Sequence, residues 1–173
     1  MVSKRHSYQI SVSWTGNRGE GTSGYRAYDR SHEVTAGPAD QGHDSAGRVR
    51  PQPIAGSSDP AFRGDPDRWN PEQLLTASLA QCHMLWYLHL CAVGGVVVTD
   101  YADNATGTMT MDVTGGGGQF TEVTLHPAVT VADPSMVDKA QALHEEVDAV
   151  CFIARSINFL VRHEPTVRVA PDA

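Results

Sequence analysis

Short stretches of alternating apolar and polar residues open the chain. Residues 7–14 alternate and are rich in β-forming side chains, which predicts a strand. A glycine-rich turn is expected over residues 15–24, followed by one or two short strands within residues 25–35. Residues 38–70 hold five of the ten prolines, so we expect a long irregular loop there. Within it, residues 56–64 form either a lid over a site or a surface loop, and the surface loop is favoured.

A long uncharged segment follows this loop. Asn70 can cap a helix that begins at Pro71, and Glu72 places an acid in the first turn. From there to Cys91 no Asp, Glu, Lys or Arg occurs. The pattern predicts a helix that is buried on all sides and ends near residues 94–95. One of its apolar faces carries Leu75, Leu79, Cys82, Trp86 and Leu90.

The rest of the chain predicts further strands around a second helix. Residues 96–113 and 120–131 resemble two strands joined by the glycines at 115–118, which is a hairpin pattern. Asp133 and Pro134 repeat the helix start, and residues 159–169 predict a last strand in which Pro165 favours an edge position. The apolar stripe of the second helix holds Met136, Ala140, Leu143, Val147, Val150 and Cys151. This order predicts an α+β fold, one domain over 1–173 in which a sheet wraps a buried helix.

The charge balance excludes several classes of partner. The chain has 13 Lys and Arg against 20 Asp and Glu, a net charge of −7, and no basic run. This argues against binding to nucleic acid and to anionic membrane surfaces. The longest apolar run, residues 84–98, is too short to cross a bilayer, and the first ten residues lack a secretory signal core. We expect a cytoplasmic protein.

Three cysteines are the first candidates for chemistry. Cys82 and Cys91 lie on opposite faces of one predicted helix, about 13 Å apart along its axis, so no disulfide can join them. No metal-ligand motif occurs, and we expect no metal site. Cys82 and Cys151 lie on the apolar stripes of their two helices, and these stripes plausibly meet. They are either ordinary core cysteines or, if a cation lies nearby, a reactive pair. Arg18 and Arg155 are the candidate cations.

Three stretches resemble one known family. Residues 70–82 (NPEQLLTASLAQC) and 144–157 (HEEVDAVCFIARSI), together with the glycine-rich loop around Arg18, resemble the OsmC/Ohr family of organic hydroperoxide-reducing thiol proteins. The second stretch is closer to the OsmC branch, because the Ohr branch more often has Cys-Pro there. The resemblance implies an antiparallel sheet wrapped around two buried central helices in an intertwined homodimer.

The resemblance also implies a site. Cys82 would be the peroxidatic cysteine and Cys151 the resolving cysteine, which condenses with the sulfenic acid to a disulfide. Arg18 would stabilise the thiolate and the peroxide oxygen, and Glu72 would hold that arginine. The cycle implies a hydroperoxide substrate and an external dithiol reductant, lipoyl or a small thiol. It needs no metal, haem or flavin cofactor.

The spacing of two of these residues supports a dimer. Glu72 and Cys82 are ten residues apart on one predicted helix, about 15 Å along its axis. Both can serve one compact site only if a long arginine bridges them or a second chain supplies one of them. We therefore expect a tight homodimer with its sites at the subunit interface.

Two other functions remain open at this point. The chain could be a binding module that holds an apolar ligand at the dimer interface, with slow cysteines. It could also be a cysteine hydrolase, which would need His83 or His144 as a base against a cysteine. His83 is expected to be a buried hydrogen-bonding histidine, and Cys91 a core thiol without a catalytic role.

Overall fold

The chain is divided by its own contacts into two compact units. The computed structural model describes residues 5–38, 47–112 and 117–171. The first unit covers residues 1–74 and the second residues 75–173. Each unit is described separately below, and the single domain expected over the whole chain stays a prediction.

The first unit is built on a three-stranded antiparallel sheet. Its strands are β1 (Ile10–Trp14), β2 (His32–Ala36) and β3 (Ile54–Gly56), with β2 in the middle. The two earlier strands confirm the strands expected within residues 7–14 and near residues 25–35. The third strand and a short 3-10 turn, η1 (Pro60–Phe62), lie inside the loop that we expected to be irregular. A three-residue strand is too short to show alternation, and its pairing with β2 is what defines it.

Helix α1 (Pro71–Gly94) begins and ends as the sequence predicts. The side chain of Asn70 accepts a 2.8 Å hydrogen bond from the Gln73 backbone N–H, and the Gln73 side chain accepts a 3.1 Å bond from the Asn70 backbone N–H. This reciprocal pair is a capping box. At the other end Gly95 has φ +74°, the Gly95 N–H donates to the Ala92 carbonyl, and the Val96 N–H donates to the Cys91 carbonyl. These bonds form a Schellman motif, for which glycine is favoured.

Replacing the capping residue is expected to destabilise the fold. Asn70→Ala removes the side-chain acceptor for the Gln73 N–H, so we expect the free energy of unfolding to fall by about 1 kcal/mol in urea titrations. Asn158→Ala is the matched control, because Asn158 is exposed and lies outside any helix. Equal unfolding free energies for the two variants would contradict the role of the cap.

One stripe of α1 is fully buried within the protomer. It consists of residues at four-residue spacing: Leu79, His83, Tyr87 and Cys91. The stripe predicted through Cys82 and Trp86 is only half-buried, and Leu85 and Val93 are 62% and 70% exposed. In the single chain the helix is therefore not buried on all sides, and its burial in a dimer stays a prediction. Because the helix is apolar all round, its periodicity could not indicate which face turns inward.

The second unit contains four strands where two long ones were expected. They are β4 (Val98–Asp103), β5 (Thr106–Met111), β6 (Gly118–Leu125) and β7 (Pro127–Val131). The predicted hairpin is formed by β5 and β6, although glycines 115 and 116 of its turn lie outside the described residues. The expected strands are each interrupted, the first at residues 104–105 and the second at residue 126. The interruptions divide the strands between two sheets.

The last segment also forms two strands, one for each sheet. β8 (Leu160–His163) pairs with β6 and β9 (Thr166–Val169) pairs with β7, and both pairings are parallel. The sheets β5-β6-β8 and β4-β7-β9 are therefore mixed, which corrects the expected antiparallel sheet. Pro165 lies between the two strands, where it interrupts no ladder.

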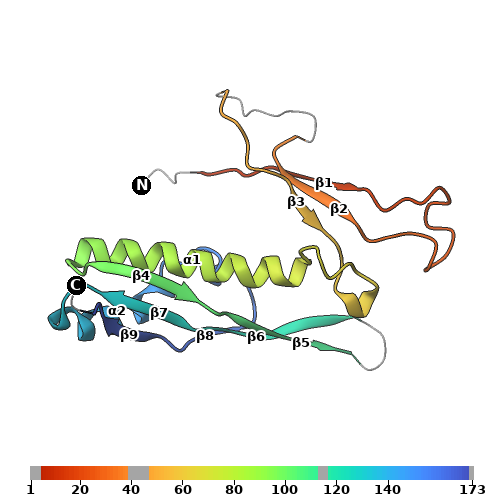
Figure 1. Ribbon diagram of the computed structural model, residues 1–173. Coiled ribbons are helices and arrows are strands. Elements are labelled where there is room, and N and C mark those ends of the chain that lie inside the picture. The colour runs from red at the N-terminus through yellow and green to blue at the C-terminus, as the bar shows by residue number, and fades with distance from the viewer. Residues whose placement is uncertain (1–4, 39–46, 113–116, 172–173) are drawn as a thin grey trace. The chain divides into compact units, whose positions relative to one another are not determined.

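A second helix closes the core of this unit. Asp133 accepts a 2.8 Å hydrogen bond from the Ser135 N–H and begins the turn η2 (Pro134–Met136), which leads into α2 (Val137–Val147). A further 3-10 turn, η3 (Ala154–Ser156), follows. In Figure 1, α1 runs along the strands of this unit. The main core cluster combines α1, α2 and the strands, and its buried members are Tyr87, Cys91, Val96, Val129, Val131, Ala140, Leu143, Val147 and Cys151.

Candidate functional site

The structure brings Cys82 and Cys151 together. Cys82 lies on α1 with its side chain half-buried, and Cys151 lies just beyond α2 and is 2% exposed. The side chains of Cys82 and Cys151 are close enough to interact, and Cys82 packs against the core cluster that contains Cys151. The two cysteines meet as expected, although Cys151 lies beyond the end of α2 at Val147 and not on the helix itself. One sulfur of the pair is partly accessible and the other is enclosed.

The surroundings of Cys151 keep its sulfur protonated. Burial, and next the hydrogen bond to Cys82, raise the pKa of the Cys151 thiol to about 11, whereas the backbone N–H of Ala154 donates to its sulfur at 3.4 Å and opposes the rise. At neutral pH the Cys151 S–H is therefore intact. It can act as a donor toward the sulfur of Cys82.

The third cysteine lies apart from this pair. Cys91 is 1% exposed, and burial raises the pKa of its thiol. Its polar contact is with the side chain of Tyr87, whose hydroxyl also donates to the Ala140 carbonyl at 3.1 Å. The surroundings of Cys91 fit the core thiol expected from the sequence.

An apolar hollow borders α1 one turn beyond Cys82. Its volume is about 230 Å³, and Leu85, Trp86 and His89 line it. The indole of Trp86 contacts the ring of Phe152 edge to face at 5.4 Å, and Phe152 directly follows Cys151. Phe152 is 66% exposed. Aromatic and aliphatic side chains thus lie near both Cys82 and Cys151.

The two other predicted site residues belong to the first unit. Arg18 is half-exposed and contacts its own loop: Nε donates to the Ala27 carbonyl at 3.2 Å, a terminal N–H donates to the Arg26 carbonyl, and Asp29 lies 3.9 Å from Nε. Glu72 lies in the first turn of α1 and is half-buried. Their roles at the thiol stay predictions. Arg155, the other candidate cation, is exposed on η3.

A buried histidine cluster joins α1, α2 and β8. His83 Nε2 and His144 Nδ1 are 2.9 Å apart, and one of them donates a hydrogen bond to the other. The rings of His83 and His163 stack with their centroids 4.4 Å apart. Tyr87 stacks on His144 at 3.8 Å. His83 is thus the buried hydrogen-bonding residue expected from the sequence. Its partners were not expected, because they lie on α2 and β8, far away in the chain.

Both members of the histidine pair are neutral at physiological pH. Burial is the main cause that lowers the pKa of His83 to about 3 and that of His144 to about 4, and the nearby His163 lowers both further. His83 Nε2 and His144 Nδ1 are hydrogen-bonded to each other. This arrangement does not favour the cysteine hydrolase, which needs an imidazole directed at a sulfur.

The described residues contain no candidate metal site and no candidate membrane span. Within residues 5–38, 47–112 and 117–171, no group of three or more His, Cys, Asp or Glu side chains has an arrangement that could hold a metal ion. None of the helices described is both long and apolar enough to cross a membrane.

Comparisons with known proteins identify the fold. An OsmC-like protein of unknown function from Vibrio cholerae matches with 25% sequence identity and a TM-score of 0.74, over 94% of this chain and 100% of that one. An organic hydroperoxide resistance protein from Elizabethkingia anophelis matches with 15% identity and a TM-score of 0.65, over 98% and 100% of the two chains. The corresponding protein of Bacillus subtilis matches with 18% identity and a TM-score of 0.56, over 93% and 98%.

The amino-acid sequence alone also identifies the family. A comparison with curated protein sequences finds no match. The sequence model of the OsmC-like protein family, however, matches residues 64–166, a range that includes Glu72, Cys82 and Cys151. That range is more than half of the chain. The protein therefore belongs to the OsmC-like protein family.

Proposed function

We propose that this protein is a thiol-dependent peroxidase that reduces organic hydroperoxides to alcohols. The observation that carries the proposal is the proximity of Cys82 and Cys151, of which Cys82 is half-buried and Cys151 is buried. A partly accessible thiol next to a second thiol is the arrangement of a two-cysteine redox cycle. Membership of a family that includes organic hydroperoxide resistance proteins supports the same chemistry.

The cycle begins with attack by Cys82. Its thiolate attacks the terminal oxygen of the hydroperoxide, the O–O bond breaks, and the alkoxide leaves with a proton as the alcohol. Cys82 becomes a sulfenic acid. The sulfur of Cys151 then attacks the sulfur of Cys82, an S–S bond forms, and water leaves. The disulfide is reduced back to two thiols by an external dithiol, lipoyl or a small thiol, which is itself oxidised to a disulfide.

Arg18 and Glu72 complete the proposed site. A guanidinium beside the reacting oxygen offsets the negative charge that develops as the O–O bond breaks. Arg18 supplies this charge in our proposal, and Glu72 orients it. The two cysteines pass the electrons from the external dithiol to the hydroperoxide, so the proposed cycle uses no metal or organic cofactor.

The apolar hollow favours an organic substrate. Leu85, Trp86 and His89 line it, and the ring of Phe152 lies against Trp86. An alkyl or aryl group can be buried there, whereas hydrogen peroxide gains nothing from such surface. We therefore propose organic hydroperoxides as the main substrates and hydrogen peroxide as a weaker one.

A homodimer is part of this proposal. Leu85 and Val93 of α1 and Tyr8 and Ile10 of the first unit are 61–92% exposed in the protomer. Large exposed apolar side chains in such number support a contact with a second copy. The cytoplasmic location expected from the sequence belongs to the same proposal.

The proposal is tested by titrating thiols before and after one equivalent of tert-butyl hydroperoxide. We expect the loss of two thiols and of two hydrogen atoms from the intact mass, with peptide mapping that assigns the disulfide to Cys82 and Cys151. The unreacted Cys91 serves as an internal control. Full retention of all thiols would contradict the peroxidase and would favour a binding module for an apolar ligand at the hollow.

A further inference from the structure

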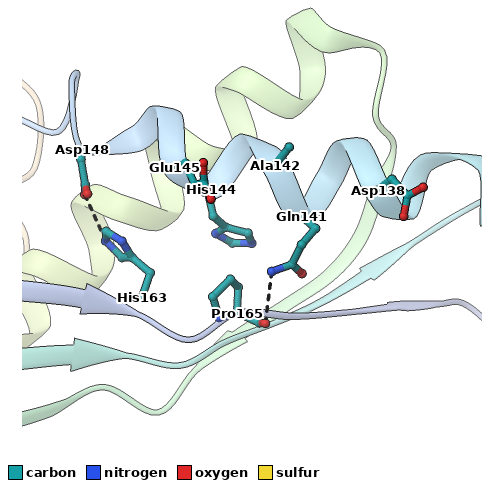
Figure 2. Close-up of a pocket in the computed structure, with 8 residues that line it drawn as sticks. All are labelled: Asp138, Gln141, Ala142, His144, Glu145, Asp148, His163 and Pro165. Carbon is teal, nitrogen blue, oxygen red and sulfur yellow. Dashed lines mark hydrogen bonds and ion pairs between the residues drawn. The ribbon is translucent and has the colours of Figure 1, made fainter.

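A second pocket borders α2, and no cysteine is among the residues that line it. It encloses about 450 Å³ between α2 and the turn that joins β8 to β9, a volume typical of sites for small organic ligands. Figure 2 shows the side chains around it. Its lining residues are Asp138, Gln141, Ala142, His144, Glu145, Asp148, His163 and Pro165. No cysteine is among them, so this pocket is distinct from the proposed peroxidase site.

The pocket is strongly acidic. Asp138, Glu145 and Asp148 supply three carboxylates at positions i, i+7 and i+10 of α2 and its C-cap, which places them along one face of the helix. The first two are separated by about 10 Å along the helix axis. None of the described residues that line the pocket is Lys or Arg. His163 Nε2 lies 3.2 Å from Asp148, and the other two carboxylates face solvent.

A buried polar atom in the pocket wall also lacks a partner. His144 is 2% exposed, and its ring lies between Gln141 and His163 in Figure 2. Nδ1 of His144 is engaged with His83, while Nε2 has no hydrogen-bond partner among the residues that the structure describes. An enclosed imidazole nitrogen without a partner costs free energy, which a ligand group can recover.

The tautomer of the histidine pair determines what this nitrogen can bind. The proposal takes the tautomer in which His144 Nδ1–H donates to His83 Nε2, so that the opposite nitrogen of His144 is an acceptor, whereas the reverse tautomer would make it a donor. An ammonium group, with three N–H donors and no acceptor, matches that lone pair and the carboxylates around it. A metal ion does not match, since no three ligands among the described residues converge on one point.

We propose that this pocket binds an aliphatic polyamine. Its ammonium groups, spaced by methylene segments, match carboxylates that are spaced along one helix face. Its methylene segments lie against the side chains of Ala142 and Pro165. The imidazole of His144 accepts a hydrogen bond from one ammonium group. Nothing in this inference depends on the proposed peroxidase activity.

The test is calorimetric titration of the full chain with spermidine at physiological salt. We expect saturable binding with one site per chain, weakened about fivefold by Asp138→Asn and about fivefold by Glu145→Gln, as for exposed ion pairs. Glu146→Gln is the matched control. Glu146 neighbours Glu145 on the same helix and is exposed, but it does not line the pocket, so its removal should leave the affinity unchanged.

A second readout follows His144 itself. In nitrogen-15 spectra of the imidazoles, spermidine should shift Nε2 of His144, whereas an uncharged diol of similar length should not. Equal weakening by Glu145→Gln and Glu146→Gln would show diffuse attraction to an acidic protein and would overturn the proposal. Absence of saturable binding up to millimolar spermidine, or equal binding of the diol, would overturn it as well.

Discussion

Replacing Cys82 with serine is expected to lower hydroperoxide turnover by at least about a thousandfold. Serine has nearly the same shape but a hydroxyl that stays protonated near neutral pH, so the nucleophile is lost while the packing is kept. The measurement is the rate of dithiol-dependent consumption of tert-butyl hydroperoxide, with circular dichroism to confirm the fold. Activity within tenfold of the parent protein would contradict the assignment of Cys82.

Two further cysteine variants make the result specific. Cys151→Ser removes the resolving thiol, so turnover should stop after Cys82 has become a sulfenic acid, which dimedone would trap as a stable adduct. Cys91→Ser is the matched control, since Cys91 contacts Tyr87 in the core and has no part in the proposed cycle, and it should keep turnover within about twofold. A cysteine hydrolase would tolerate the loss of Cys151 or of Cys82.

Mild acid is expected to destabilise the protein through its buried histidine pair. The pKa of His83 is lowered from 6.5 to about 3 and that of His144 from 6.5 to about 4, mainly by burial. Between these values and pH 6.5 the unfolded chain binds more protons than the folded chain. Stability from the pair is therefore complete above pH 6.5 and is lost as the pH falls toward the folded-state values. At pH 5 each imidazole accounts for a loss of about 2 kcal/mol.

A loss of about 4 kcal/mol for the pair is large compared with the total stability of a typical domain. The measurement is urea unfolding between pH 8 and pH 5. His144→Gln should remove about half of this pH dependence, while His6→Gln should not change it, because His6 is exposed near the start of the chain. A pH dependence that is the same in both variants and the parent protein would show that other groups cause it.

The local signals in the sequence predicted both ends of α1 and the turn that leads into α2, whereas α2 ends at Val147, before the Val150 and Cys151 of its expected stripe. Asn70 and Pro71, Asp133 and Pro134, and Gly95 act through contacts with residues a few positions away, so their meaning is independent of the rest of the fold. The meeting of Cys82 with Cys151 was predicted from two apolar stripes, because stripes in a small fold have few other surfaces to pack against. The OsmC-like motifs added the redox roles.

The features that the sequence did not reveal depend on distant contacts. The parallel pairs β6–β8 and β7–β9 join strands separated by the whole of α2, and no pattern within either strand shows its partner. The histidine cluster is similar: His83, His144 and His163 come from three elements, and their spacing fits no motif. The burial of His144 could have been suspected, because it directly follows Leu143 of the apolar stripe.

The parallel pairing of the late strands has a consequence for biosynthesis. Strands β8 and β9 are made after every element that they pair with, and each adds a third strand to one of the two sheets. In a nascent chain that has already formed α1 and α2, one edge of each of the two sheets is therefore still unpaired, and the histidine cluster still lacks His163. Long-range pairing of this kind is slow, and during that delay both thiols of the pair are open to oxidation by chance partners. A reducing environment during translation thus keeps Cys82 and Cys151 as free thiols until the fold brings them together.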